Sequence, residues 1–238
     1  MKLVGFDIET WKITPDEATD IKAFRPLGIS CVGFRSDQGT GTYFPEDIKT
    51  SDRAMNQHEL MSVADELWRY VHEGYQIVTW NGLQFDFDIL NEEADCLLQN
   101  IPRLAMDHHI DMMFQVVCSL GYPLGLDTAA KGMGLPGKME GMHGDLAPVM
   151  WRRGFAERQK VVEYVGKDAI ATLELANVIL EKQYLRWISK SGRVQVKPMA
   201  ELLTVKKCLE LPMPDTSWMS NPLKRESFTE WMKETKHE

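Results

Sequence analysis

Acidic and phenolic side chains recur in three short segments that lie far apart in the chain. The three segments are Asp7-Ile8-Glu9-Thr10, Asn81-Gly82-Leu83-Gln84-Phe85-Asp86 and Tyr164-Val165-Gly166-Lys167-Asp168. Side chains two apart on a strand share a face, so Asp7 and Glu9 would point the same way. Side chains four apart on a helix are neighbours, so Tyr164 and Asp168 would present a phenol and a carboxylate to one spot.

Asp86 would lie where a predicted strand over residues 76–80 gives way to a helix, close to the crevice that opens beyond parallel strands. Carboxylates held within a few Å of one another repel, and a divalent cation removes the conflict. Ligand sets made only of oxygen suit Mg²⁺ or Mn²⁺, and two such ions about 4 Å apart can clamp the attacking and leaving oxygens of a phosphodiester. The pattern therefore indicates a metal-dependent nuclease.

Strand-like and helix-like segments follow one another along the chain, which predicts an α/β fold. We expect strands at residues 2–9, 27–35, 41–44, 76–80 and 106–110. We expect helices at residues 56–72, from about 84 onward, and at 111–120, 127–133 and 157–182, with residues 121–144 forming a surface loop around the short helix.

The chain changes character after residue 183. Residues 184–188 and 194–196 read as a β-hairpin, and three prolines and a possible helix at 224–233 follow. We therefore expect one domain over residues 1–183 and an appendage over residues 184–238. Between Lys182 and Lys207 there are seven basic residues and one acid, so a phosphate backbone can lie there; a solvated basic hairpin explains the run equally well.

Bulk composition excludes several classes of protein. No apolar run is long enough to cross a bilayer, and no secretory signal precedes Asp7, so we expect a cytoplasmic protein. The cysteines at 31, 96, 118 and 208 form no CxxC pair and predict buried, reduced thiols rather than a zinc site. The net charge of −8 leaves nucleic-acid binding open, because the distribution of charge matters more than its sum.

Over residues 1–182 the chain resembles the ribonuclease-H-like DEDD superfamily of 3′–5′ exonucleases, and most of all the proofreading domain of family-B DNA polymerases. The first segment matches the first family motif letter for letter, Asn81 with Phe85 and Asp86 matches the second, and Tyr164 with Asp168 matches the third. Glu163 stands where a second subgroup carries histidine, so the tyrosine subgroup is implied. The resemblance implies a mixed β-sheet flanked by helices, and no polymerase region is visible.

The resemblance also implies roles for individual residues. Asp7, Glu9 and Asp168 would hold one Mg²⁺ or Mn²⁺ ion, with Asp7 bridging to a second ion and Asp86 holding that second ion. Tyr164 would orient the attacking water, and the product would be a 5′-mononucleotide. Nucleic acid, DNA more than RNA, is the implied partner. The 3′–5′ direction of the reaction and its restriction to chain ends are implied by the resemblance alone. Residues expected to contact the substrate are Thr10, Trp11, Asn81, Phe85 and Lys138, although core packing would explain the aromatic ones.

Other interpretations of single features remain. Asp88 competes with Asp86 but lies about 200° further round a helix. Asp111 can reach the crevice or simply cap the helix after it. His108 and His109 are strand neighbours that face opposite ways, so one of them is expected in the core. Residues 132–138 fit part of a phosphate-binding loop, but Met139 replaces the required Ser or Thr.

Two rival functions keep the same fold. The chain can be a nucleic-acid-binding module or polymerase accessory with a dead site, although a protein that only binds has no need to gather repelling acids. The appendage can also dock a replication or repair partner.

Overall fold

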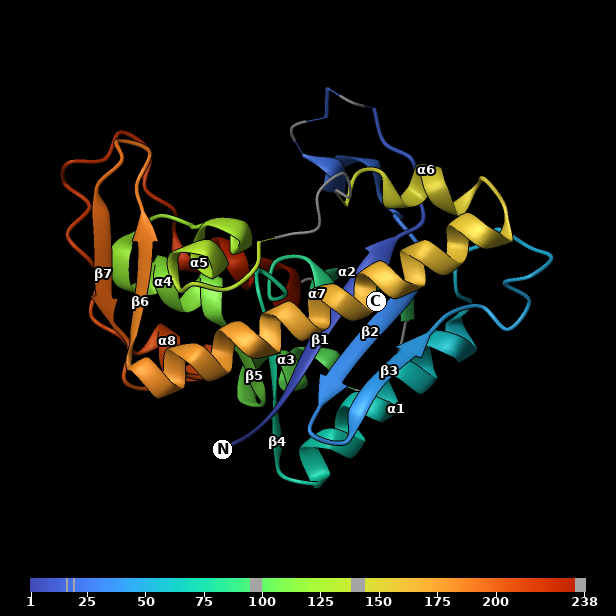
Figure 1. The fold of residues 1–238 in the computed structure, drawn as a ribbon, viewed down its shortest axis with the longest axis horizontal. Helices are drawn as coiled ribbons and strands as arrows, with labels where there is room; N and C mark the ends of the chain where they lie inside the picture. Colours follow the sequence, from blue (N-terminus) through green and yellow to red (C-terminus); the bar gives the residue numbers. More distant parts are fainter. Residues whose placement is uncertain (16, 19, 95–99, 138–143, 234–238) are drawn as a thin grey trace.

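A five-stranded mixed sheet forms the centre of the computed structural model, which describes residues 1–15, 17–18, 20–94, 100–137 and 144–233. The strand order is β3-β2-β1-β4-β5, with β1, β2 and β3 antiparallel and β4 and β5 running parallel to β1. The strands are β1 (Lys2–Thr10), β2 (Ile29–Ser36), β3 (Gly39–Tyr43), β4 (Tyr75–Thr79) and β5 (His109–Asp111). Helices flank the sheet, so the predicted ribonuclease-H-like α/β fold is confirmed (Figure 1).

Two layers of helices enclose the sheet. The long helix α7 (Phe155–Lys182) crosses one face, and α1 (Gln57–His72) and α2 (Asp86–Ala94) pack on the other (Figure 1). The remaining helices are η1 (Ile21–Phe24), α3 (Ile101–Asp107), α4 (Met112–Leu120), α5 (Leu126–Gly132), α6 (Ala147–Trp151), α8 (Val205–Leu209), η2 (Arg225–Phe228) and η3 (Glu230–Lys233). Within the described residues, no helix has the length and apolarity that a bilayer span requires.

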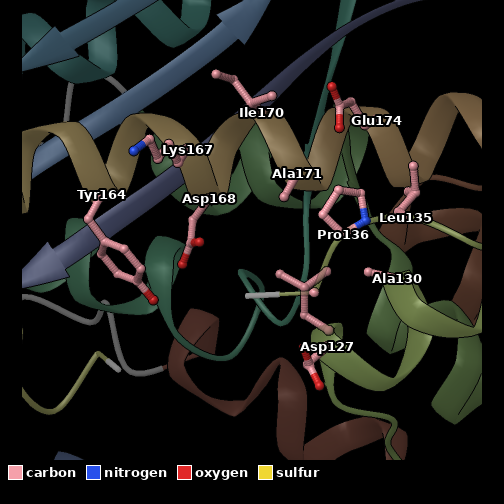
Figure 2. Close-up of a pocket in the computed structure, with 12 residues that line it drawn as sticks. Asp127, Ala130, Leu135, Pro136, Tyr164, Lys167, Asp168, Ile170, Ala171 and Glu174 are labelled. Carbon is pink, nitrogen blue, oxygen red and sulfur yellow. The ribbon is translucent and has the colours of Figure 1, made fainter. Parts of the chain in front are cut away.

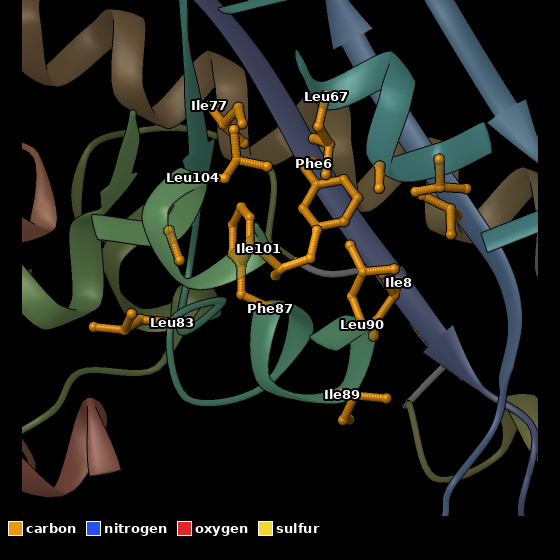
Figure 3. Close-up of a cluster of buried hydrophobic side chains, with 14 of the residues drawn as sticks. Phe6, Ile8, Leu67, Ile77, Leu83, Phe87, Ile89, Leu90, Ile101 and Leu104 are labelled. Atoms are coloured by element: carbon orange, nitrogen blue, oxygen red, sulfur yellow. The ribbon is translucent and has the colours of Figure 1, made fainter. Parts of the chain in front are cut away.

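Strand β1 sends its side chains alternately to the two layers, as a pleated strand must. Phe6 and Ile8 are buried against Phe87 and Leu90 of α2 and Leu67 of α1 (Figure 3). Asp7 and Glu9 therefore face the other layer, where α7 lies. The hydrophobic core on one face thus fixes the orientation of the two acids on the opposite face.

Glycines allow α7 to lie unusually close to the sheet. A Cβ atom on Gly5 of β1 would lie 2.2 Å from the carbonyl oxygen of Ala169, and one on Gly33 of β2 would lie 2.5 Å from that of Val165. Real Cβ atoms do not approach backbone that closely, so the two positions require glycine. This contact sets the height of the α7 side chains above β1.

Several predicted elements need correction. Residues Met106 and Asp107 end the helix α3, and the strand that was expected there begins only at His109. The helix expected over 224–233 is two short 3₁₀ helices, η2 and η3. Helices η1, α3, α6 and α8 were not predicted, because each is only four to seven residues long and shows too little periodicity.

The chain after residue 183 packs against the sheet and its helices. The hairpin of β6 (Tyr184–Ile188) and β7 (Val194–Pro198) contacts α5, and α8 contacts α3, α4 and β5. Phe228 and Trp231 belong to the same buried cluster as Phe6. In the same segment, the Arg225 guanidinium donates to the carbonyl oxygen of Cys118 at 2.6 Å.

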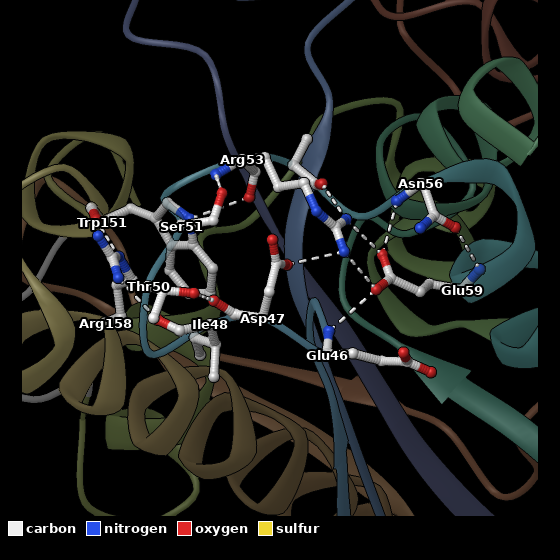
Figure 4. A network of polar contacts seen from close by, with 11 residues as sticks. Glu46, Asp47, Ile48, Thr50, Ser51, Arg53, Asn56, Glu59, Trp151 and Arg158 are labelled. Carbon is white, nitrogen blue, oxygen red and sulfur yellow. Dashed lines mark hydrogen bonds and ion pairs between the residues drawn. The ribbon is translucent and has the colours of Figure 1, made fainter.

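A polar network joins the segment after β3 to the start of α1 and to α6 and α7 (Figure 4). Glu59 accepts hydrogen bonds from the Arg53 guanidinium at 2.7 and 2.8 Å and from the Asn56 amide at 2.7 Å, completing a capping box. On the other side, Arg158 of α7 donates to the carbonyl oxygens of Trp151 and Ile48. Burial of Glu59 raises the pKa of its carboxyl, but these hydrogen bonds outweigh it and lower the pKa to about 2.

We expect Glu59→Gln to lower the free energy of unfolding by about 2 kcal/mol at pH 7. Because the folded-state pKa lies below the ordinary value of 4.5, the stabilisation is complete above that value and is lost as the pH falls toward 2. Urea unfolding should therefore show that the difference in the free energy of unfolding between wild type and variant becomes smaller as the pH falls from 7 to 3.5. The control is Glu210→Gln at an exposed position, which should change the free energy of unfolding only slightly at every pH. A destabilisation by Glu59→Gln that does not change with pH would contradict the prediction.

Gly33→Ala should lower the free energy of unfolding by about 1–3 kcal/mol, because α7 must move away from β2 to admit the methyl group. The matched control is Gly41→Ala in the neighbouring strand β3, where an added Cβ meets nothing within 4 Å. Urea unfolding of both variants measures the effect. Equal stabilities of the two variants would show that the close contact of α7 is not required.

Candidate active site

Three carboxylates meet between β1 and α7. Asp7 and Glu9 project from β1 and Asp168 from α7, and each offers one oxygen atom so that these atoms all lie within 4.8 Å of one another. Glu9 and Asp168 are buried and Asp7 is half-buried. An oxygen-only group of this size suits a hard divalent cation, and the three acids are therefore a possible metal site.

The negative charge of these acids helps to raise the pKa values of two neighbouring groups. Burial, followed by the charges of Asp168 and Glu9, raises the pKa of the Tyr164 phenol well above its ordinary value. Burial and the charges of Glu9 and Asp7 likewise raise the pKa of Cys31, which lies opposite Glu9 in β2. Tyr164 is consequently a protonated phenol at neutral pH and can donate a hydrogen bond.

Asp86 adds a fourth carboxylate to the site from the start of helix α2. Beyond the point where β1 and β4 stop pairing, the Ile8 amide donates to a carboxylate oxygen of Asp86 at 3.0 Å. Asp86 lines the same cavity as the three acids but is not among the atoms that lie within 4.8 Å of one another. Asp88 points elsewhere, because it pairs with Lys22 at 3.2 Å and Arg25 at 2.5 Å.

The turn between β4 and α2 is held by backbone contacts. Asn81 adopts a left-handed conformation with a φ of 72°, which asparagine tolerates better than most residues. Its amide and that of Leu83 donate to Asp111 at 3.0 and 2.9 Å, and the Phe114 amide donates to the same carboxylate at 3.0 Å. Asp111 thus caps α4, one of the two alternatives that the sequence left open, and it also holds the turn; it is not among the residues that line the cavity described next.

One cavity of about 240 Å³ collects these side chains. Its lining includes the expected residues Asp7, Glu9, Thr10, Asn81, Phe85, Asp86, Tyr164 and Asp168. It also includes residues that the sequence did not indicate, among them Lys12, Thr14, Ile21, Trp80, Asp145 and Pro148. The only sequence signal for Lys12 is that it lies two residues after Thr10 of the first motif. No pattern in the sequence links Asp145 to the other acids.

Of the expected substrate contacts, Trp11 is not part of the cavity lining, and Lys138 lies outside the described residues. The Trp11 indole N–H donates to the Asp52 carbonyl oxygen, and the Arg152 guanidinium lies 3.9 Å from the ring centroid. Trp11 therefore packs beside α6 instead of facing a substrate.

The remaining candidates have structural explanations. His109 is fully buried beside Phe87, and burial lowers the pKa of His109 to about 3, so it is a neutral core residue. Gly132 ends a helix and packs on Arg186, and a phosphate-binding loop would instead follow a strand. The three cysteines among the described residues are buried and free.

A second cavity of about 170 Å³ adjoins the first and shares Tyr164 and Asp168 with it. It lies between α7 and the segment that begins with α5, with Asp127 and Pro136 facing α7 across the gap (Figure 2). Its other walls are mostly apolar side chains. Asp168 and Tyr164 therefore border both cavities, whereas Asp7, Glu9 and Asp86 border only the first.

Comparison with curated proteins gives no match for this chain. Residues 4–180 match the sequence profile of the RNase_H superfamily, a range that includes β2 to β5, all but the first two residues of β1, and the acids on β1, α2 and α7. Members of this superfamily are generally nucleases that act on nucleic acids with divalent metals. On the evidence of its sheet topology, its cluster of acids and this match, the chain belongs to the RNase_H superfamily.

Proposed function

We propose that this chain is a metal-dependent 3′–5′ exonuclease of the tyrosine DEDD subgroup, which removes 5′-mononucleotides from nucleic-acid 3′ ends. The convergence of Asp7, Glu9 and Asp168 within 4.8 Å, in a cavity that also holds Asp86 and Tyr164, is the observation that carries the proposal. DNA is the expected substrate, and that preference rests on the resemblance to proofreading domains.

The acids suit Mg²⁺ or Mn²⁺ better than a softer metal, because the group that the described residues form consists of carboxylates alone. Asp7, Glu9 and Asp168 would hold one ion, and Asp7 with Asp86 would hold a second. When bound, the ions supply Lewis-acid chemistry, which acidifies water and neutralises charge that develops on the phosphate.

The chain's own residues would position the other partners of the reaction. Tyr164, whose pKa is raised, keeps its proton and can orient an attacking water by a hydrogen bond. Phe85 lines the cavity and offers a face on which a terminal base can stack. Thr10 and Asn81 line the same cavity, and the side-chain oxygen of Asn81 is buried without a hydrogen-bond partner among the described residues.

We assign the reaction to residues 1–183 and treat residues 184–238 as an extension. The hairpin exposes Lys190 and Arg193 and can contact a phosphate backbone. The extension also exposes Met213 and Leu223, at 70% and 37%, which supports docking of a replication or repair protein. Because truncation would remove core residues, replacing Met213 and Leu223 with Ser and comparing pull-downs is the cleaner check.

Digestion of end-labelled DNA and RNA oligonucleotides with Mg²⁺ or Mn²⁺ tests the function. A 5′ label should give a ladder of products shortened one nucleotide at a time, whereas a 3′ label should appear at once as a mononucleotide. Inactivity on single-stranded, duplex and mismatched DNA and on RNA would favour the binding-module alternative.

Asp7→Asn should reduce the rate of digestion at least about 100-fold, because Asp7 is proposed to serve both ions. The fold should remain intact, since Asp7 is half-buried and contributes no apolar packing. A matched control is Glu181→Gln, an exposed acid on α7 that should leave the rate unchanged. Activity in Asp7→Asn within a few-fold of wild type would refute the assignment.

Asp168→Asn offers a test that does not depend on turnover. Removing one of three crowded charges should raise the free energy of unfolding by about 1 kcal/mol without divalent metal. Added Mn²⁺ should stabilise the wild type more than the variant, because it binds only the folded site. Thermal unfolding with EDTA and with Mn²⁺ measures both effects, and an equal Mn²⁺ shift in the two proteins would place the metal elsewhere.

A further inference from the structure

The turn of residues 80–85 carries Asn81 and Phe85 and leads directly into Asp86. Its backbone also sets the first turn of α2, since the Phe87 amide donates to the Gly82 carbonyl oxygen at 2.8 Å. A displacement of this turn would therefore move four residues that line the cavity, namely Trp80, Asn81, Phe85 and Asp86. What holds the turn in place consequently matters for the site.

Groups from four separate parts of the chain form hydrogen bonds with the backbone of this turn. The Thr79 hydroxyl accepts from the Gly82 amide at 3.0 Å, and Asp111 accepts from the amides of Asn81 and Leu83. From η1, the Lys22 ammonium donates to the Gln84 carbonyl oxygen at 3.0 Å. The fourth contact comes from the extension.

Trp231 supplies that fourth contact from 148 residues further along the chain. Its indole N–H donates to the Leu83 carbonyl oxygen at 2.8 Å and to that of Phe228 at 3.1 Å. Trp231 is only 8% exposed, and the Phe228 ring packs 5.1 Å from Phe114 of α4. Both peptide groups of Leu83 are therefore held, the N–H by Asp111 and the C=O by Trp231.

The two contacts on Leu83 act as a pair. Leu83 is itself fully buried, so its peptide groups have no water to replace a lost partner. Asp111 caps α4, and α4 also contacts η2, the helix that ends at Phe228. The extension and the carboxylate thus form one support for the turn, which is made of residues outside the cavity lining.

We propose that Trp231 and Asp111 are positioning residues for the turn of residues 80–86, which makes the extension part of the working nuclease. The inference rests on the proposed function for its effect on turnover, but the support of the turn can be tested without it. Neither residue lines the cavity, so both act through Asn81, Phe85 and Asp86.

Trp231→Phe tests the proposal, because it keeps an aromatic ring in the core and removes only the N–H donor and part of the volume. Trp218→Phe is the matched control: Trp218 also lies in the extension, and its indole N–H donates to the Asp215 carbonyl oxygen at 3.1 Å, away from the turn. Hydrogen–deuterium exchange of a peptide spanning residues 80–86 measures support of the turn. Steady-state rates on a single-stranded DNA oligonucleotide, at a temperature where both variants are folded, separate kcat from KM.

For Trp231→Phe we expect faster exchange in residues 80–86 and a 5- to 50-fold lower kcat, with KM within about 3-fold of wild type. Trp218→Phe should change neither quantity. Asp111→Asn should lower kcat as well, and the double variant should fall short of the product of the two single effects because both act on one turn.

Unchanged exchange in Trp231→Phe would overturn the proposal, and so would faster exchange with an unchanged kcat. A loss of kcat in Trp218→Phe as large as that in Trp231→Phe would also overturn it, since the effect would then not pass through Leu83. If the wild type digests no nucleic acid, the proposed function fails, while the exchange data still decide whether Trp231 supports the turn.

Discussion

The close contact between α7 and the sheet is the constraint on which the rest of the structure depends. Gly5 and Gly33 let the helix backbone touch β1 and β2 directly, with no side-chain layer between them. Asp168 therefore comes within reach of the acids on β1. A helix held at the usual distance from the sheet would leave the carboxylates too far apart to share a cation.

Hydrophobic packing on the other face of β1 offsets the electrostatic repulsion among the acids of the site. Crowded carboxylates destabilise the folded chain in the absence of a cation, and burial of Phe6 and Ile8 against α1 and α2 opposes that repulsion. Because side chains alternate along β1, the stabilising residues and the repelling ones are sequence neighbours. The arrangement is one in which binding of a divalent ion would strengthen the fold as well as enable the chemistry.

The sequence predicted the elements whose periodicity is strong and missed contacts that leave no local pattern. The alternation in β1 and the long apolar stripe of α7 gave both elements to within two residues. Trp11 follows the first motif directly, yet its ring packs beneath Arg152, and spacing alone cannot reveal such a rotation. The bond from Trp231 to Leu83 joins residues with no shared motif, so only coordinates could disclose it.

That same bond has a consequence for the order in which the molecule is made. The chain emerges from the ribosome amino end first, so the strands of the sheet and the helix α7 appear well before residue 231. Until then the carbonyl group of Leu83 lacks its indole donor, and the turn is held by Thr79, Asp111 and Lys22 alone. On the proposal made above for Trp231, the geometry of this turn is completed only after residue 231 has emerged, so a nascent polypeptide can have its sheet and α7 folded while the candidate active site is still incomplete.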